Sequence, residues 1–101
     1  MAVIDIPAVP VHPGEILEEE FLRPLALSQT DLAKHIGVSV RRVNEICRVR
    51  RAITTETAWL LACAFGTTPK FWLNGQAIYE LALARQQDRL RDVGLIVAKV
   101  G

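Results

Sequence analysis

The sequence lacks the features that mark membrane proteins and most enzymes. Its longest uncharged apolar run, Ala58 to Phe65, is far shorter than the ~20 residues that a membrane-spanning helix needs. Its first residues show neither the basic segment nor the continuous apolar stretch of a secretory signal. It contains no glycine-rich phosphate loop, no GxSxG motif and no evident acid–base pair. We therefore expect a cytoplasmic protein that has no membrane partner and is not an enzyme.

Potential metal ligands are also scarce. The only cysteines, Cys47 and Cys63, lie sixteen positions apart and form no CxxC pair, and neither His12 nor His35 stands at ligand spacing from another such residue. We therefore expect no metal site and no cofactor. Both cysteines fall in apolar, helix-like surroundings, so we interpret them as reduced thiols of the core.

The net charge of +1 conceals an uneven distribution of charge. Residues 28–53 carry six basic side chains and two acidic ones, a local charge of +4, whereas the other 75 residues carry six basic and nine acidic ones, a charge of −3. A cationic segment on an acidic body indicates that one face of the molecule binds a polyanion.

The N-terminal part divides into an arm and a first helix. Three prolines within the first thirteen residues disfavour helix before each of them, so residues 1–12 are predicted to form an extended arm with the alternation of an edge strand. From Pro13 the pattern becomes helical, because proline is tolerated in a first helical turn. Leu17, Phe21 and Leu25 recur at four-residue spacing and predict one buried stripe.

Caps and glycines delimit four further helices, so the sequence predicts an all-α fold of five helices. Four residues suit N-caps and begin these helices: Ser28, Ser39, Thr54 and Thr68. Gly37 and Gly66 end two of the helices, and the last runs to about Arg85. Helical spacing predicts that these residues are buried: Leu32, Ile36, Val43, Ile46, Cys47, Ala58, Leu61, Ala62, Phe65, Leu73, Ala77 and Leu81.

We accordingly divide the chain into an extended arm (1–12), a five-helix domain (13–85) and a C-terminal tail (86–101). The structure of the tail is open, because Arg85 to Arg91 is charged and able to extend the last helix, whereas Gly94 to Val100 is rich in the β-branched residues typical of a strand. An apolar strand at a chain end is expected to pair with the arm, a second copy or a partner chain.

The segment from Gln29 to Arg48 is typical of a helix-turn-helix motif. Two helices that cross steeply need a small residue at their contact, which Ala33 supplies, and a residue free to adopt positive φ in the turn, which Gly37 supplies. Apolar anchors stand where the two helices require them: Leu32, Ile36, Val38, Val43 and Ile46. The motif therefore predicts that the second helix binds double-stranded DNA.

The second helix of such a motif lies in the major groove with its first residues toward the bases. Arginine bonds guanine, asparagine bonds adenine, glutamate accepts from the cytosine amino group and valine packs on the thymine methyl. The base-contacting candidates are therefore Ser39, Val40, Arg41, Arg42, Asn44 and Glu45, with Arg41 first. Arg42 is suited to either bases or phosphate. The alternative for Glu45 is an ion pair with Arg41 or Arg42 on the helix surface.

Further candidates flank this helix and suit the phosphate backbone. The helix N-terminus at Ser28 and Gln29 offers backbone N–H groups, and Arg48, Arg50 and Arg51 add positive charge on the other side. Such contacts position the protein on the duplex without reading its sequence. The alternative for Arg50 and Arg51 is an ordinary solvated loop.

Residues 12–85 resemble the HigA/VapI branch of the xenobiotic-response-element-type antitoxins. The motif HPGEIL opens the first helix and TTPKFWLN opens the fifth, and these two end motifs separate the branch from phage-repressor-like domains that share only the middle. The resemblance implies a phage-repressor-like fold and a homodimer. It also implies that the protein neutralises a RelE-like, HigB-type toxin that cleaves messenger RNA, and that it represses its own operon at a palindromic operator, where it would be associated with the nucleoid.

The resemblance also bears on particular residues. By position, Ser39, Val40, Arg41, Arg42 and Glu45 fall on the DNA-reading surface of the family, and Gln29 falls on a phosphate-contacting position. Because dimer contacts in the family commonly involve the C-terminal helices, Trp72, Tyr79 and Leu83 are candidate dimer or partner contacts. The tail after Arg85 lies outside the resemblance, and its apolar segment from Gly94 to Val100 adds Leu95 and Val97 as further candidates. One departure is Val49, which replaces the usual glycine after the recognition helix, so that either the helix ends differently here or Val49 carries strain.

Three alternatives remain at this point. A repressor of the same fold without a toxin would lack a small basic open reading frame beside its gene. An RNA-cleaving enzyme, such as the toxin itself, would carry a sheet and a concentrated basic surface. A pure protein-interaction adaptor would show no salt-dependent DNA binding.

Overall fold

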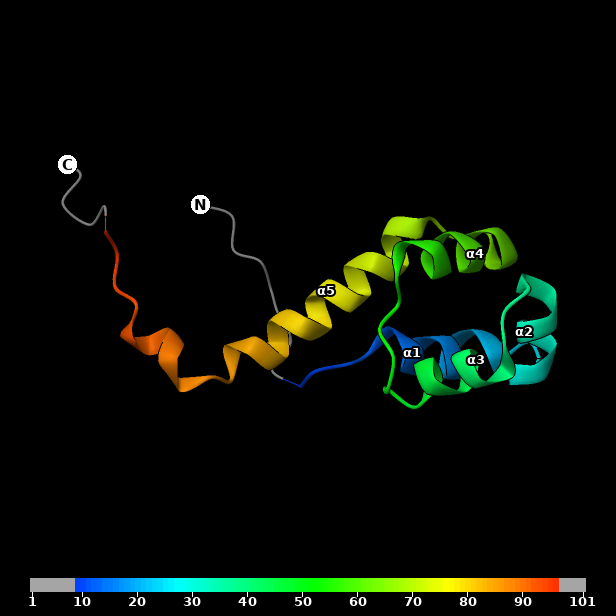
Figure 1. The fold of residues 1–101 in the computed structure, drawn as a ribbon, viewed down its shortest axis with the longest axis horizontal. Helices are drawn as coiled ribbons and strands as arrows, with labels where there is room; N and C mark the ends of the chain where they lie inside the picture. The colour runs from blue at the N-terminus through cyan, green and yellow to red at the C-terminus, as the bar shows by residue number, and fades with distance from the viewer. Residues whose placement is uncertain (1–8, 97–101) are drawn as a thin grey trace.

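The computed structural model describes residues 9–96, and every regular element in this range is helical. The elements are α1 (Pro13–Ile16), the π-helical η1 (Leu17–Leu22), α2 (Gln29–Ile36), α3 (Val40–Cys47), α4 (Thr55–Phe65), α5 (Pro69–Arg85) and the short 3₁₀ helix η2 (Asp88–Asp92). Because α1 continues directly into η1, the prediction of an all-α fold with five helices is confirmed. In the view of Figure 1, α4 lies above α1 and α3, α2 closes one end, and α5 runs toward the C-terminus.

No helix within residues 9–96 has both the length and the apolar character that a membrane span requires.

The predicted N-caps and glycine stops are confirmed. Each predicted cap side chain accepts a hydrogen bond from the backbone N–H three residues further on, and the four caps are Ser28, Ser39, Thr54 and Thr68. Gly37 and Gly66 end α2 and α4 with φ of 75° and 73°. A glycine adopts this left-handed conformation without the steric penalty that a Cβ brings, so both helices end where the sequence predicts.

The N-terminus of α1 packs between α3 and α5. His12 caps α1: its Nδ1 accepts from the Gly14 N–H at 2.8 Å, and its own backbone N–H donates to Glu15 Oε2 at 2.9 Å. A Cβ on Gly14 would stand 1.8 Å from the carbonyl oxygen of Ile46 in α3. Only glycine therefore allows the backbone of α1 to pass this close to the last turn of α3.

On its other side, the same N-terminus meets α5. A Cβ on Gly75 would stand 3.3 Å from the Cβ of the fully buried Pro13, and the rings of His12 and Tyr79 pack edge to face at 4.8 Å. Burial lowers the pKa of His12, although Glu15 and Glu80 oppose the shift. A neutral His12 keeps Nδ1 free to accept the Gly14 N–H, so the HPGE sequence builds a packed joint between three helices.

Aromatic side chains fill the space between the first helix and α5. Trp72 is fully buried, packs against Phe21 and Phe71 at ring centroid distances of 5.1 and 4.9 Å, and donates its indole N–H to Thr67 Oγ1 at 2.8 Å. The remaining buried core residues come from all four other helices and the loop before α4: Leu17, Leu22, Leu32, Ala33, Val43, Ile46, Ile53, Ala58 and Leu61. Most of the residues predicted to be buried in α2, α3 and α4 do lie in or against this core.

The predicted apolar stripe of the first helix is wrong at its end. Leu25 is exposed, and Leu22 is fully buried in its place. The reason is the π-helical turn of η1, whose i→i+5 geometry puts Leu17 and Leu22, five residues apart, on one face. A four-residue spacing assumes an ordinary α-helix and therefore misses this register.

The predicted face of α5 and the predicted burial of both cysteines are also wrong in part. Ala77 and Leu81 are exposed, whereas Gln76 and Ala82 are buried, because the wholly buried Trp72 sets the rotation of α5. Gln76 is held inside by the N–H of Ile53, which donates to its Oε1 at 3.0 Å. Cys63 is exposed, while Cys47 is half-buried and burial raises the pKa of its thiol to about 12.

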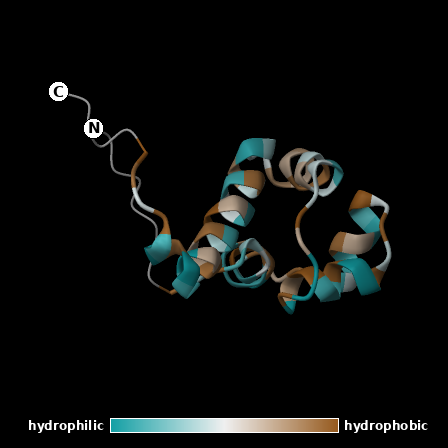
Figure 2. Cartoon of the chain, turned by 60° about the vertical axis from the view of Figure 1, so that its left-hand side comes forward, coloured by the Kyte–Doolittle hydropathy of each residue, from teal (hydrophilic) through white to brown (hydrophobic). Residues whose placement is uncertain are grey.

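Neither end of the chain shows the proposed strands within the described residues. Residues 86–92 form a turn and η2 in place of a longer α5, and residues 93–96 form no strand. Leu95 and Ile96 are exposed. The described chain ends in a hydrophobic segment, coloured brown in Figure 2. Most of the predicted arm and the last residues of the proposed tail strand lie outside the described part.

Val49 occupies a left-handed conformation after α3, with φ of 62°. Two hydrogen bonds enforce it: the N–H of Arg50 donates to the carbonyl of Glu45 at 2.8 Å, and that of Val49 donates to the carbonyl of Ile46 at 3.1 Å. The sequence left two possibilities open, a different end of the helix or strain at Val49, and the structure shows the strain. A β-branched residue in this conformation is a genuine outlier.

We expect Gly14→Ala to destabilise the fold by about 3 kcal/mol, because the new methyl group overlaps the Ile46 carbonyl and α1 must move away from α3. Urea denaturation followed by circular dichroism measures the change. Gly94→Ala is the matched control, because a Cβ there meets nothing within 4 Å. Equal stability of the two variants would contradict the close packing of α1 against α3.

We expect Val49→Gly to stabilise the fold by about 1 kcal/mol. The substitution relieves about 1–2 kcal/mol of strain in the left-handed conformation. The greater freedom of glycine in the unfolded chain offsets part of this gain. Thermal unfolding gives the difference. Val49→Asn, which tolerates the conformation without the added freedom of glycine, should also stabilise. A loss of stability in both variants would show that Val49 contributes more through packing than its backbone strain costs.

Candidate DNA-binding surface

The residues predicted to form the helix-turn-helix come together as predicted. Ala33 is buried where α2 meets α3, and the N–H groups of Gly37 and Val38 both donate to its carbonyl, at 2.9 and 3.0 Å. The turn between the helices is therefore closed by hydrogen bonds on one acceptor. Val43 and Ile46 are buried on one side of α3, and this fixes which side of the helix faces outward.

The first turn of α3 presents the leading base-contacting candidates. The side chain of Arg41 is 85% exposed, and Val40 is also exposed. Ser39 is the N-cap, and its Oγ accepts from the N–H of Arg42 at 3.1 Å, so its hydroxyl has a structural task as well. Arg42 is half-buried and pairs with Glu56 of α4 at 3.1 Å.

Glu45 stands at the centre of the charged surface of α3. Its Oε2 accepts from Arg41 Nε at 3.1 Å, and its Oε1 accepts from Arg51 Nε and Nη2 at 2.9 and 2.7 Å. The hydrogen bonds from Arg51, and then the one from Arg41, lower the pKa of Glu45. The ion pair with Arg41, which the sequence left as an alternative, is therefore present, and Arg51 joins it.

Asn44 and Gln29 belong to a chain of hydrogen bonds that crosses three helices. Asn44 Nδ2 donates to Gln29 Oε1 at 3.0 Å, and Gln29 Nε2 donates to Glu18 Oε1 at 3.0 Å. Both amide side chains are half-buried at this point. These hydrogen bonds fix the N-terminus of α2 relative to α3. The predicted phosphate contact at Gln29 and the predicted base contacts of α3 therefore stay at a constant distance from each other.

The other phosphate candidates lie on both sides of α3. Ser28 forms a capping box with Asp31: its Oγ accepts at 2.9 Å, its N–H donates at 3.1 Å, and these bonds lower the pKa of Asp31. Arg48 and Arg50 are exposed at the end of α3 and form no ion pair within residues 9–96. Their guanidinium groups are therefore available to phosphates.

Two acidic residues of this surface were missed by the sequence reasoning, namely Glu18 and Glu56. Each is bonded to a candidate from which it is distant in sequence, Glu18 to Gln29 and Glu56 to Arg42. No local pattern marks such partners, because only the packing of η1, α2, α3 and α4 brings them together.

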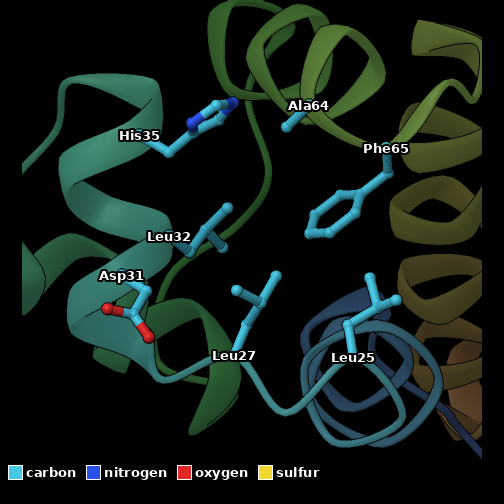
Figure 3. Close-up of a pocket in the computed structure, with 7 residues that line it drawn as sticks. All are labelled: Leu25, Leu27, Asp31, Leu32, His35, Ala64 and Phe65. Carbon is cyan, nitrogen blue, oxygen red and sulfur yellow. The ribbon is translucent and has the colours of Figure 1, made fainter.

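An apolar pocket lies apart from this surface, between the turn after η1, α2 and α4 (Figure 3). It has a volume of about 400 Å³ and contains none of the DNA-contacting candidates; its lining residues are Leu25, Leu27, Asp31, Leu32, His35, Ala64 and Phe65. The leucine and phenylalanine side chains point toward one another across the gap (Figure 3). Among the described residues, no group of three or more His, Cys, Asp or Glu side chains is placed to hold a metal ion.

The candidates for dimer or partner contacts differ in their exposure. Trp72 is wrong as a contact residue, because it is fully buried in the core. Tyr79 is half-buried against His12, whereas Leu83 and Leu95 are exposed on α5 and beyond η2. Val97 lies outside the described residues.

The chain is similar to known helix-turn-helix proteins. The family model "Helix-turn-helix" matches residues 19–72. Virulence-associated protein I of Dichelobacter nodosus is 49% identical over 82 residues, which cover 81% of this chain and 74% of that protein. Antitoxin HigA-1 of Vibrio cholerae is 39% identical over 71% of this chain and 68% of its own length.

A solved structure extends the comparison to three dimensions. The antitoxin HigA of Pseudomonas aeruginosa, solved with the higBA promoter, has a TM-score of 0.81 and 37% sequence identity, and the match covers 91% of this chain and 100% of that one. The chain therefore belongs to the helix-turn-helix family, in the branch that includes the HigA-type antitoxins.

Proposed function

We propose that this chain is the antitoxin of a toxin–antitoxin module. As a homodimer in the cytoplasm, it binds a palindromic operator in double-stranded DNA, represses its own operon, and binds and neutralises a HigB-type, RelE-like toxin that cleaves messenger RNA. The observation that carries the DNA-binding part is the first turn of α3, where Val40 and Arg41 are exposed while Val43 and Ile46 lock the opposite side of the helix into the core. The likeness to HigA, which was solved with the higBA promoter, also supports DNA binding.

The exposed residues divide into base and phosphate contacts. Arg41 suits a guanine and Val40 a thymine methyl, at the end of α3 that enters the groove first. Arg48, Arg50 and the N-terminus of α2 suit phosphates on the two sides of the groove. Asn44 is not included among the proposed base contacts, because its amide already bridges α3 and α2 through Gln29.

A dimer follows from the symmetry of a palindromic operator. Two copies related by a two-fold axis place two α3 helices in successive major grooves, about 34 Å apart. Leu83 and Leu95 offer exposed apolar surface on the C-terminal side of each copy.

We expect Arg41→Ala to weaken operator binding by roughly 10- to 100-fold and to relax discrimination at one base pair, with little effect on random DNA. Fluorescence anisotropy with both duplexes at several salt concentrations measures this. Arg50→Ala is the matched control: it should weaken both duplexes alike and reduce the salt slope by about 1, as for a phosphate contact. An equal loss on both duplexes for Arg41→Ala would contradict its base-reading role.

The toxin-binding part is tested with the small open reading frame beside this gene. Expression of the neighbouring protein alone should arrest growth and cleave messenger RNA, and co-expression of this chain should abolish both effects through a complex of fixed stoichiometry. A harmless neighbour, or toxicity that this chain does not relieve while operator binding is intact, would instead establish a repressor without a toxin.

A further inference from the structure

We propose that Glu45 is a positioning residue for DNA recognition: its carboxylate holds the guanidinium groups of Arg41 and Arg51 in place and reads no base of its own. This inference rests on the proposed function, because it concerns how the same surface distinguishes an operator from other DNA. Its starting point is the position of one carboxylate between two arginines that come from different parts of the chain.

The carboxylate of Glu45 is already engaged on both oxygens. One oxygen accepts from Arg41 Nε and the other accepts from Nε and Nη2 of Arg51, so three hydrogen bonds fill most of the roughly four acceptor positions of the group. The Glu45 side chain is 23% exposed, against 85% for Arg41. A cytosine amino group would therefore meet the arginine before it met the carboxylate.

The contact with Arg41 determines which part of that guanidinium is free. Glu45 binds Nε, so the two terminal nitrogens of this exposed side chain remain as a fork of donors. Guanine recognition requires two parallel donors for O6 and N7, which this fork supplies. Arg41 also lies one helical turn nearer the N-terminus of α3, the end that faces the bases.

The contact with Arg51 fixes the loop after α3. The backbone carbonyl of Glu45 accepts from the N–H of Arg50, and its side chain binds Arg51, so this single residue restrains both arginines just after the strained turn at Val49. The loop carries positive charge that suits phosphates. Glu45 thus couples the base-reading residue to the phosphate-contacting loop.

The charge of Glu45 is consistent with positioning. A lone carboxylate in the groove would be repelled by the phosphates, but here two guanidinium groups surround it and the cluster of three side chains keeps a net positive charge. Exposed ion pairs of this kind contribute little to stability, so replacement of Glu45 should leave the fold intact.

The experiment is a double-mutant cycle with Arg41→Ala, Glu45→Gln and both together, measured on the operator, on random DNA and on operators with all four bases at each position. We expect Glu45→Gln to weaken operator binding roughly tenfold and to relax discrimination at the base pair that Arg41 reads. In the Arg41→Ala background, Glu45→Gln should weaken operator binding by no more than about twofold, because Arg41, the residue that Glu45 positions, is absent.

Two outcomes would overturn the proposal. If Glu45 reads a cytosine directly, the losses of the two variants multiply, and Glu45→Gln shifts the preferred base at a separate position toward adenine. Glu19→Gln is the matched control, since it removes an exposed i,i+4 pair with Arg23 at 3.0 Å outside the DNA-contacting surface, and it should change neither affinity nor base preference. If the parent protein binds no operator more tightly than random DNA, the proposed function itself fails, and this outcome is distinct from multiplicative losses in a parent that does bind.

Discussion

The backbone of α1 passes so close to the last turn of α3 that no side chain fits between them, and the placement of the recognition helix depends on this contact. Gly14 lies against the carbonyl of Ile46, His12 caps the helix that brings it there, and Pro13 is buried on the side of α5. The HPGE motif is therefore a structural element that keeps α3, the proposed DNA-reading helix, at a fixed angle to the rest of the domain.

The surface of α3 is a network of paired charges. Arg41, Arg42 and Arg51 are each bonded to a glutamate, whereas Arg48 and Arg50 face solvent. Exposed pairs of this kind contribute little to the stability of the fold. The local charge of +4 counted from the sequence thus overstates the number of free cations, and the pairing supplies the orientation that bare charge lacks.

Features that depend on neighbouring residues could be predicted from the sequence. The caps at Ser28, Ser39, Thr54 and Thr68 and the glycine ends of α2 and α4 are local hydrogen-bonding and φ preferences, and the structure has them in place. Features set by tertiary packing could not be predicted. The π-helical turn that buries Leu22, the rotation of α5 that buries Trp72, and the bonds of Glu18 and Glu56 to the site all require the other helices to be in position.

The central claim is that α3, held by the joint with α1, is the surface that meets DNA. Amide hydrogen exchange with and without a saturating operator duplex tests it across the whole chain at once. The account predicts slower exchange at the start of α2, along α3 and in the loop through Arg51, with α4 unchanged. Protection confined to α4 and α5, with α3 exchanging as in the free protein, would contradict it.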